Sequence, residues 1–383
     1  MSERLRILLS GMVAGDPHQG GATWAVLQYL AGLEELGHEV MLVEPVPAAA
    51  LDPSGPVPRY FGSLPMPAGR AALLAAGGEE TVGAPYPALA EFARDADLLL
   101  NVSGMLRDER LLEAVPARAF LDLDPGFNQV WEATGEGMGF GLHTHHVTVG
   151  VRLGAEDCPI PTLGRDWIPT LPPVVLDRWP TATEPPARDA FTSVGHWRSY
   201  GSIEHGGVVY GQRAHSLRPL LELPRRSGAR FELALGIHPD ETEDLRALRE
   251  NGWGLLDPAA VAGTPADYAE FVRSSKAELG IAKSGYVVSR SGWFSDRSAC
   301  YLASGRPVLH QDTGFAESLP VGEGLLSFTG VADAAAAVAA VETEPGRHGR
   351  AAREIAAEHL DSRRVLPRLL ERLAVPARRE ATR

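Results

Sequence analysis

A chain of 383 residues with 44% hydrophobic residues is long enough for two domains and has the composition of a soluble globular protein. No apolar run reaches the ~18 residues of a membrane-spanning helix, and the N-terminus lacks the apolar core and cleavage site of a signal peptide. Two cysteines give no disulfide framework, so we expect a cytoplasmic protein. The formal net charge of −13 argues against nucleic acid and anionic membranes as partners.

The first half of the chain predicts alternating strands and helices. Residues 4–10 have the pattern of a buried strand, and a glycine-rich loop follows. Residues 22–36 then carry apolar side chains at helical spacing and precede a strand at 39–43. This βαβ unit predicts a parallel sheet. Further strands are expected at 97–102, 119–123 and 143–151, and helices at 71–76, 88–93 and 127–134.

The loop before the first helix invites comparison with a dinucleotide-binding turn. Glu44 ends the second strand, where a ribose-binding acid would stand. Ten residues separate Gly11 from Ala22, however, which is too many for the tight G-x-G-x-x-G turn. We therefore disfavour a nicotinamide cofactor and expect Gly20 and Gly21 to let a donor ligand approach the backbone closely.

A proline-rich segment separates two halves that share one plan. Residues 159–186 hold eight prolines and no amphipathic period, so we place domains at 1–170 and 189–383 with a linker at 171–188. The second half predicts strands at 191–194, 231–235, 279–282 and 286–289, and helices at 214–221, 265–274, 297–303, 331–342 and 347–373. The sequence thus predicts two Rossmann-like, doubly wound α/β domains that face each other across a cleft.

The start of the predicted helix 297–303 has the features of an anion site. Ser295 and Asp296 stand at its N-cap position. Backbone N–H groups at a helix start attract anions, and the side chains of Arg297 and Ser298 add donors. We expect a diphosphate there, with arginine contacts because only two of the 36 basic residues are lysines.

Two short motifs stand out in the second half of the chain: Gly305-Arg306-Pro307-Val308, and GEGLLSF at 322–328. Through them the second half resembles the donor domain of the GT-B glycosyltransferases, whose helix–turn–strand signature is similar to the first motif, and is similar to the group 1 nucleotide-sugar enzymes. The resemblance implies an acceptor-binding first domain, a donor-binding second domain and a final helix that packs back toward the first.

The resemblance also implies roles for individual residues. Glu317 stands where such enzymes carry an acid near the donor. Arg198 and Arg213 are the nearest matches to their diphosphate-binding Arg and Lys. Gly292 and Cys300 replace the two glutamates of the retaining group, so retaining stereochemistry cannot be carried over.

The function that the resemblance implies is transfer of a sugar from a nucleoside diphosphate to an acceptor, without a metal or a cofactor. We expect a small-molecule acceptor in bacterial specialised-metabolite or cell-surface sugar biosynthesis. If the reaction inverts, a base must deprotonate the acceptor. His18, in a loop facing the cleft, is the first candidate, followed by Asp124 and His196. A nucleotide-sugar epimerase of the same fold and a non-catalytic binding protein with a degenerate donor site stay open as alternatives.

Overall fold

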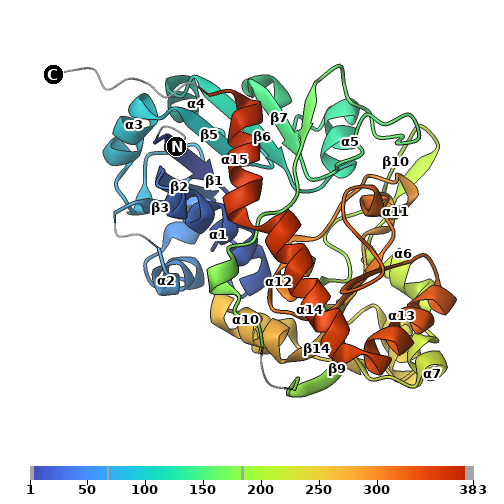
Figure 1. Cartoon of the computed structure of the whole chain (residues 1–383). Helices are drawn as coiled ribbons and strands as arrows, with labels where there is room; N and C mark the ends of the chain where they lie inside the picture. The colour runs from blue at the N-terminus through green and yellow to red at the C-terminus, as the bar shows by residue number, and fades with distance from the viewer. Residues whose placement is uncertain (1–3, 67–68, 183–184, 376–383) are drawn as a thin grey trace.

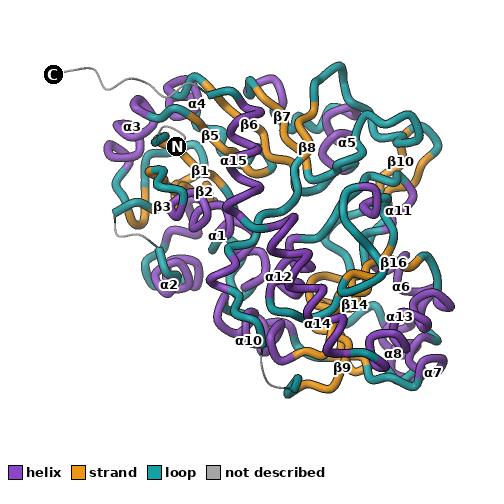
Figure 2. Tube along the Cα trace, viewed as in Figure 1, coloured by secondary structure: helices purple, strands orange, loops and turns teal. Residues whose placement is uncertain are grey.

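Two β-sheets lie in the two halves of the chain, with helices packed around them (Figure 1; Figure 2 shows strands in orange and helices in purple). The computed structural model describes residues 4–66, 69–182 and 185–375. The first sheet has the strand order β4-β3-β2-β1-β5-β6-β7-β8 and is parallel except for the antiparallel pair β3–β4. Its strands are β1 Arg6–Ser10, β2 Glu39–Val46, β3 Ala71–Ala75, β4 Thr81–Gly83, β5 Leu98–Val102, β6 Ala117–Asp122, β7 His145–Thr148 and β8 Trp167–Pro169. Its helices are α1 Gly20–Glu35, α2 Pro56–Ser63, α3 Tyr86–Asp95, α4 Glu109–Ala114 and α5 Phe127–Thr134.

The second sheet is parallel throughout and has the order β13-β12-β9-β14-β15-β16. Its strands are β9 Arg188–His196, β12 Phe231–Gly236, β13 Gly254–Leu255, β14 Ser275–Gly280, β15 Val308–Gln311 and β16 Leu325–Phe328, and a separate hairpin is formed by β10 Ile203–His205 and β11 Val208–Tyr210. The helices are α6 Arg213–Leu217, α7 Leu223–Ser227, α8 Thr242–Glu250, α9 Pro258–Ala262, α10 Pro265–Ser274, α11 Ser284–Val288, α12 Asp296–Ala303, α13 Val331–Thr343, α14 Pro345–Ile355 and α15 Ser362–Leu373. The expected two-sheet α/β architecture is confirmed.

Both faces of each sheet are buried, as parallel sheets require. Successive residues of a strand point to opposite faces, and on β1 this places Ile7 and Leu9 in one hydrophobic cluster and Leu8 in another. On β12, Leu233 and Ala234 divide in the same way. The apolar side chains on both faces of these strands follow from this double burial.

The chain crosses between the halves twice, once around residues 170–175 and again around residues 359–362. These two crossing segments are hydrogen-bonded to each other. The amide of Val174 donates to the carbonyl of Leu360 at 2.8 Å, and the amide of Ser362 donates to the carbonyl of Val174 at 2.9 Å. After the second crossing α15 packs on α1, where a Cβ at Gly32 would lie 2.7 Å from Cδ1 of Leu366. The final helix therefore shares the core of the first half. The domain limits 1–170, 171–188 and 189–383 stay predictions.

Three expected elements are wrong. Residues 71–76 form β3 rather than a helix, because every residue of β3 is buried in the sheet and burial overrides the helix propensity of alanine. Residues 286–289 belong largely to α11, since the chain turns directly after β14. The helix expected at 347–373 is interrupted by a π-turn at 356–360, and α15 restarts after Asp361, whose carboxylate accepts from the amide of Arg363 at 2.9 Å.

Among the helices of the described residues, none combines the length and apolar character that crossing a membrane requires.

Candidate functional site

The loops at the carboxyl ends of the two sheets meet between the halves. Gln19, in the loop after β1, accepts at Oε1 a hydrogen bond from Nε2 of His196, the last residue of β9, at 2.9 Å. The amide of Gln19 in turn donates to the carboxylate of Asp16. Ligands of open parallel sheets bind beyond the carboxyl ends of the strands. The candidate site therefore lies between these loops.

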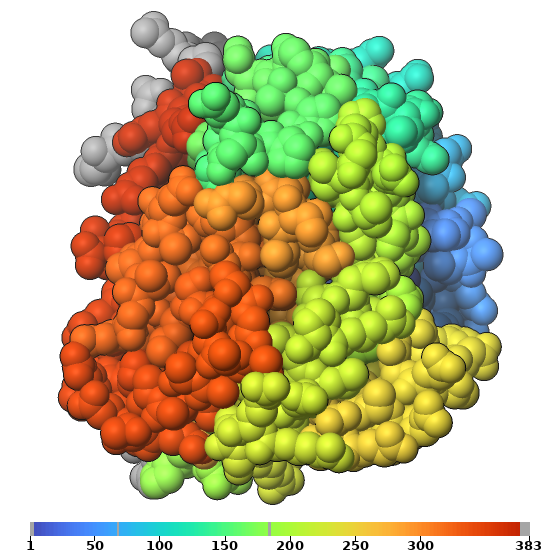
Figure 3. All heavy atoms as spheres, turned by 90° about the vertical axis from the view of Figure 1, so that its right-hand side faces the viewer, coloured from blue at the N-terminus to red at the C-terminus, as the bar shows by residue number. Residues whose placement is uncertain are grey.

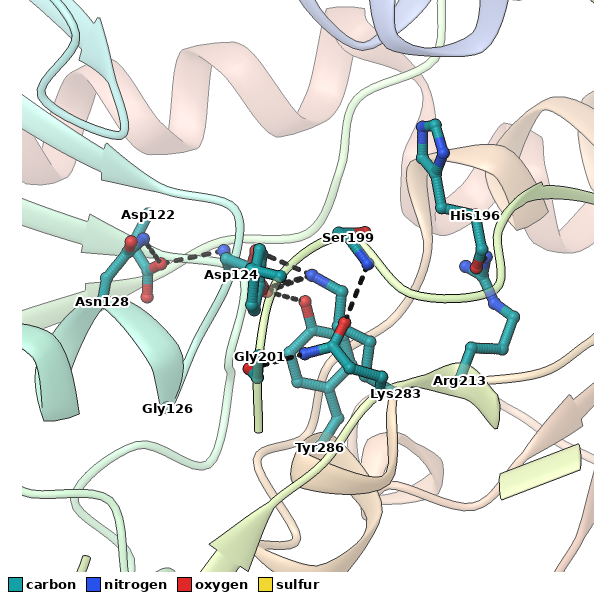
Figure 4. A network of polar contacts seen from close by, with 12 residues as sticks. Asp122, Asp124, Gly126, Asn128, His196, Ser199, Gly201, Arg213, Lys283 and Tyr286 are labelled. Carbon is teal, nitrogen blue, oxygen red and sulfur yellow. Dashed lines mark hydrogen bonds and ion pairs between the residues drawn. The ribbon is translucent and has the colours of Figure 1, made fainter. Parts of the chain in front are cut away.

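Lys283, which follows β14, joins the two halves through Asp124, which follows β6 (Figure 4). Its Nζ lies 2.8 Å from Oδ2 and 2.9 Å from Oδ1 of Asp124, and the hydroxyls of Tyr200 and Tyr286 donate to the same carboxylate. The ammonium also lies 4.2 Å from the ring centre of Tyr200 and 5.1 Å from that of Phe127. Asp124 already accepts hydrogen bonds from three donors, which disfavours its taking a proton from an acceptor hydroxyl. The base role expected for Asp124 therefore has no geometric support.

Burial and ion pairing act against each other on Lys283. Desolvation lowers the pKa of this ammonium, and the charge and hydrogen bonds of Asp124 raise it. The cation is thus tied to one carboxylate from the other half of the chain.

Asp122 holds the end of β6 beneath this network. Its Oδ1 accepts from the amide of Asn128 at 2.6 Å and from the backbone of Asp124 at 2.9 Å. Its Oδ2 accepts from Gln129 at 2.8 Å and from the hydroxyl of Thr148 at 2.7 Å. Burial raises the pKa of Asp122, and these four donors oppose that rise. The carboxylate orders the loop that carries Asp124.

Arg213 is a buried cation to which the described residues offer no carboxylate partner. Its Nε donates to the carbonyl of Ile281 at 3.0 Å, and its Nη1 donates to the carbonyl of His196 at 2.6 Å. Burial, and after it the charge of Arg297, lowers the pKa of Arg213 to about 9, so the guanidinium is still charged at neutral pH. Burying a charge without a counterion is costly. An anionic ligand beside Arg213 would supply the missing counterion, and the donor contact expected of this arginine stays a prediction.

The start of α12 is built as expected, but Arg297 is used differently. Ser295 is the N-cap, and its Oγ accepts from the amide of Arg297 at 3.2 Å. The guanidinium of Arg297 turns into the domain interior, where Nε donates to Glu278 at 2.6 Å and Nη1 donates to the carbonyl of Val194 at 3.1 Å. Because this arginine already has a carboxylate partner, the phosphate contact expected of it has no support in the geometry.

Asp296 and Ser298 complete the first turn of α12. The Oγ of Ser298 is buried and has no hydrogen-bond partner among the described residues. Burial raises the pKa of Asp296, and the neighbouring charge of Arg297 opposes the rise. An anion at this helix start would thus meet two groups. One is the unpaired hydroxyl of Ser298, and the other is the carboxyl group of Asp296, whose pKa burial raises.

His18 and Arg198 are exposed, in contrast to Arg213. His18 has a left-handed backbone with φ of 67°, and its ring lies 5.6 Å from the ring of Tyr60. Arg198 forms an ion pair with Glu241. The donor contact expected for Arg198 therefore has no support in the geometry, and the base role of His18 stays a prediction.

Glu317 belongs to an ion-pair cluster between the halves. Its carboxylate accepts from Nε of Arg152 at 3.0 Å and from Nη2 of Arg290 at 3.4 Å. Both arginines also pair with Asp157. Glu317 is thus occupied by protein partners, and the donor role expected for it is not supported.

Gly20 and Gly21 serve contact between the halves rather than access for a ligand. A Cβ at Gly20 would lie 2.2 Å from the carbonyl oxygen of Thr264, and one at Gly21 would lie 2.9 Å from the ring of Tyr268. Beside them, the indole of Trp24 donates to the carbonyl of Pro265 at 2.8 Å. The close approach expected at the two glycines is real, but its partner is α10 and the turn before it.

We expect Gly20→Ala to lower the free energy of unfolding by about 1–3 kcal/mol, because the added methyl must displace backbone. Gly62→Ala is the matched control. Gly62 is exposed on α2 with open space around it, so alanine should raise the free energy of unfolding by about 0.5–1 kcal/mol. Urea unfolding measures both. Equal effects of the two substitutions would contradict the assigned contact.

The hairpin β10–β11 packs against the first half of the chain, and the loop that precedes it is held by the side chain of Gln212. Tyr210 packs in the same cluster as Phe127 of α5, and Figure 3 shows the yellow-green segment around 200–215 against the green part of the first half. Gln212 accepts from the amide of Ser199 at 3.1 Å and donates to the carbonyl of Gly201 at 3.3 Å. These bonds order the loop that carries Tyr200, whose hydroxyl donates to Asp124; Figure 4 shows Ser199 and Gly201 beside this network.

Sequence reasoning missed Lys283, Tyr200 and Tyr286. The signal for Lys283 was present, since it is one of two lysines in an arginine-rich chain and directly follows a buried strand. The two tyrosines carry no such signal, because their role depends on a carboxylate about 80 to 160 positions away.

The same architecture occurs in several solved glycosyltransferases. An α-glucosyltransferase in complex with UDP-glucose and DNA containing an abasic site aligns over 97% of this chain and 100% of its own, with a TM-score of 0.64 and 12% identity. AviGT4, a glycosyltransferase involved in avilamycin A biosynthesis, aligns over 97% of both chains, with a TM-score of 0.58 and 16% identity. The chain has the fold of the GT-B glycosyltransferases. Anabaena HepE in complex with UDP and glucose is a further GT-B neighbour, with 97% and 100% of the chains covered, a TM-score of 0.58 and 11% identity. No family model matches this GT-B chain, and no curated protein matches it either.

The exclusion of nucleic acid as a partner, drawn from the net charge, is wrong. Neighbours of the same fold and nearly the same length are solved with DNA bound, one with an abasic site and another with a central A:G mismatch. A net charge describes the whole surface, whereas a nucleic acid contacts one part of it. The overall value of −13 therefore cannot decide this question.

Proposed function

We propose that this protein transfers a sugar from a nucleoside diphosphate to a hydroxyl group of an acceptor. The observation that carries the proposal is Arg213, a buried cation without a carboxylate partner in the described chain, at the meeting place of two sheets with the GT-B fold. Neighbours with this fold are solved with UDP or UDP-glucose. A diphosphate supplies the anion that this position lacks.

The proposed mechanism stabilises the leaving diphosphate electrostatically. Negative charge grows on the diphosphate as the glycosidic bond to the donor breaks. Preorganised donors in a site without bulk water are effective against such charge. The donors we assign are Nη2 of Arg213, which has no hydrogen-bond partner in the described residues, and the hydroxyl of Ser298. The N–H groups at the start of α12 that the Ser295 cap leaves free complete the set. We propose that these groups act without a metal or a cofactor.

We propose His196 as the base if the reaction inverts. Figure 4 shows its ring pointing away from the Asp124 network, and its Nε2 donates to Gln19 of the first half. The side chain of His196 is exposed to solvent, but desolvation by its surroundings lowers its pKa below the usual 6.5. The charges of Arg213 and Lys283 lower the pKa further, and Asp16 opposes them. The ring is therefore neutral at pH 7 and free to accept a proton.

The pH dependence of kcat tests this assignment. Because only the neutral ring accepts a proton, kcat should fall as the pH drops through a value below 6.5. His196→Ala should remove that decline and lower kcat about 100-fold or more, whereas His238→Ala, at an exposed position, should change neither. If the decline persists in His196→Ala and disappears in His18→Ala, His18 is the base instead.

The experiment that tests the proposed function is a thermal-shift panel of UDP, TDP, GDP, ADP and CDP. A ligand that binds the native state raises the apparent melting temperature by mass action. We expect a clear shift with one nucleotide and transfer from the matching nucleotide sugar. No shift with any of the five at millimolar concentration would overturn the proposal in favour of a binding protein with a degenerate donor site. Conversion of the nucleotide sugar in the absence of acceptor would favour the epimerase.

The acceptor stays a prediction. AviGT4 is described as acting in avilamycin A biosynthesis, whereas the α-glucosyltransferase is solved with DNA. We therefore propose an acceptor screen that holds hydroxylated small molecules of bacterial secondary metabolism together with DNA containing hydroxymethylated bases. Incorporation of radiolabelled sugar into one class identifies the acceptor chemistry.

A further inference from the structure

A pocket of about 320 Å³ lies beside the place where the chain crosses between its halves. In Figure 1, α15 in red runs alongside the green segment that leads out of the first sheet. The pocket is lined by Val151, Pro169, Thr170, Leu171, Ser318, His359, Val365, Arg368, Leu369 and Arg372. These residues come from both halves, from both crossing segments and from the last helix.

The lining combines an apolar wall with three basic side chains. Leu171, Val365 and Leu369 supply hydrocarbon, and His359, Arg368 and Arg372 supply nitrogen donors, while no acidic residue lines the pocket. This composition is the reverse of the chain as a whole, which carries a formal charge of −13.

The two arginines stand one turn apart on α15 and point toward the same opening. Residues at i and i+4 share a helix face. Arg372 is fixed at the rim, because its Nη1 donates to the carbonyl of Pro169 at 2.8 Å. Arg368 is exposed and makes no ion pair in the described part of the chain. A ligand anion can therefore approach Arg368 without displacing a protein carboxylate.

We propose that this pocket binds a small organic anion that carries an apolar group, such as a phosphate ester or carboxylate with a short hydrocarbon portion. Small-molecule sites have volumes from about 300 Å³ and combine apolar walls with a few placed polar groups. The basic rim takes the anionic end through charge-assisted hydrogen bonds, and the leucine and valine side chains take the hydrocarbon.

A ligand in this pocket contacts both crossing segments at once. Thr170 and Leu171 precede Val174, and His359 precedes Leu360, and these two segments are hydrogen-bonded to each other. A ligand shifts a conformational equilibrium by its difference in affinity for the two states. Because its lining depends on the present placement of both segments, the bound anion favours this arrangement of the halves.

The probe for the test is n-hexyl phosphate, titrated by calorimetry into the full-length protein. We expect saturable binding of n-hexyl phosphate. The Kd of ethyl phosphate should be at least tenfold higher, because ethyl phosphate lacks four of the methylenes that the pocket would bury. Arg368→Gln should raise the Kd for n-hexyl phosphate at least tenfold. Arg364→Gln, on the same helix one turn earlier but outside the pocket, should leave the Kd unchanged.

Two results would overturn the proposal. One is equal affinity of the wild-type and Arg368→Gln proteins, which would place the probe elsewhere. The other is loss of n-hexyl phosphate binding when the protein is saturated with the nucleotide found in the thermal-shift panel, which would place the probe in the cleft. Both variants change exposed side chains, and a melting curve for each confirms that it is folded.

Discussion

Replacing Arg213 with methionine is expected to raise the Kd of the nucleoside diphosphate about 10- to 100-fold. Hydrogen bonds to a charged group contribute about 1.5–3 kcal/mol, and 1.4 kcal/mol corresponds to a factor of ten. Methionine fills a similar apolar volume but provides neither charge nor donor. Isothermal titration calorimetry with the nucleotide selected by the thermal-shift panel measures the change directly.

The same substitution should have a much smaller effect on folding. Arg213 costs free energy as a desolvated charge without a carboxylate partner, yet it donates to the carbonyls of Ile281 and His196. These contributions oppose each other, so we expect the free energy of unfolding to change by less than about 2 kcal/mol. Arg198→Met, which removes an exposed arginine paired with Glu241, is the control and should leave the Kd unchanged. Equal nucleotide affinity in all three proteins would contradict the site.

The fold could be predicted largely from local pattern because each strand and helix carries its own periodicity. Helix α10 falls at the expected residues 265–274, and α5 at 127–134. Prediction failed where long-range burial decides the structure, as in β3. Its alanines and leucines pair with the distant strand β2, where Leu42 lies opposite Ala71.

The site could be predicted only in part, because the sequence does not show which charges find partners. Arg297, Arg198 and Glu317 looked like donor contacts by position, yet each is paired with a residue distant in the chain. Arg213 is distinguished from them by what it lacks, a carboxylate within reach in the described structure. The sequence predicts a strand at 286–289 and so gives no role to Lys283, whereas the structure has it as the N-cap of α11, paired with Asp124.

Asp124→Asn is expected to destabilise the protein by about 3–5 kcal/mol, because it leaves the buried ammonium of Lys283 without its counterion. Lys283→Met alone should also destabilise, since Asp124 then keeps only hydroxyl donors. In the double variant neither charge is left unpaired. Its loss of stability should therefore fall short of the sum of the single losses by about 1.5–3 kcal/mol, measured by urea unfolding at pH 7.

A matched comparison separates this buried contact from ion pairing in general. Glu222 and Arg226 form an exposed pair one turn apart, for which we expect a coupling of about 0.5 kcal/mol or less. Asp124 and Lys283 belong to opposite halves, so a coupling several times larger would mean that their bond contributes to holding the two halves together. A coupling no larger than that of the surface pair would mean that packing at α1, α10 and α15 holds the halves in place. The Asp124–Lys283 contact could then open to admit substrate at little cost in stability.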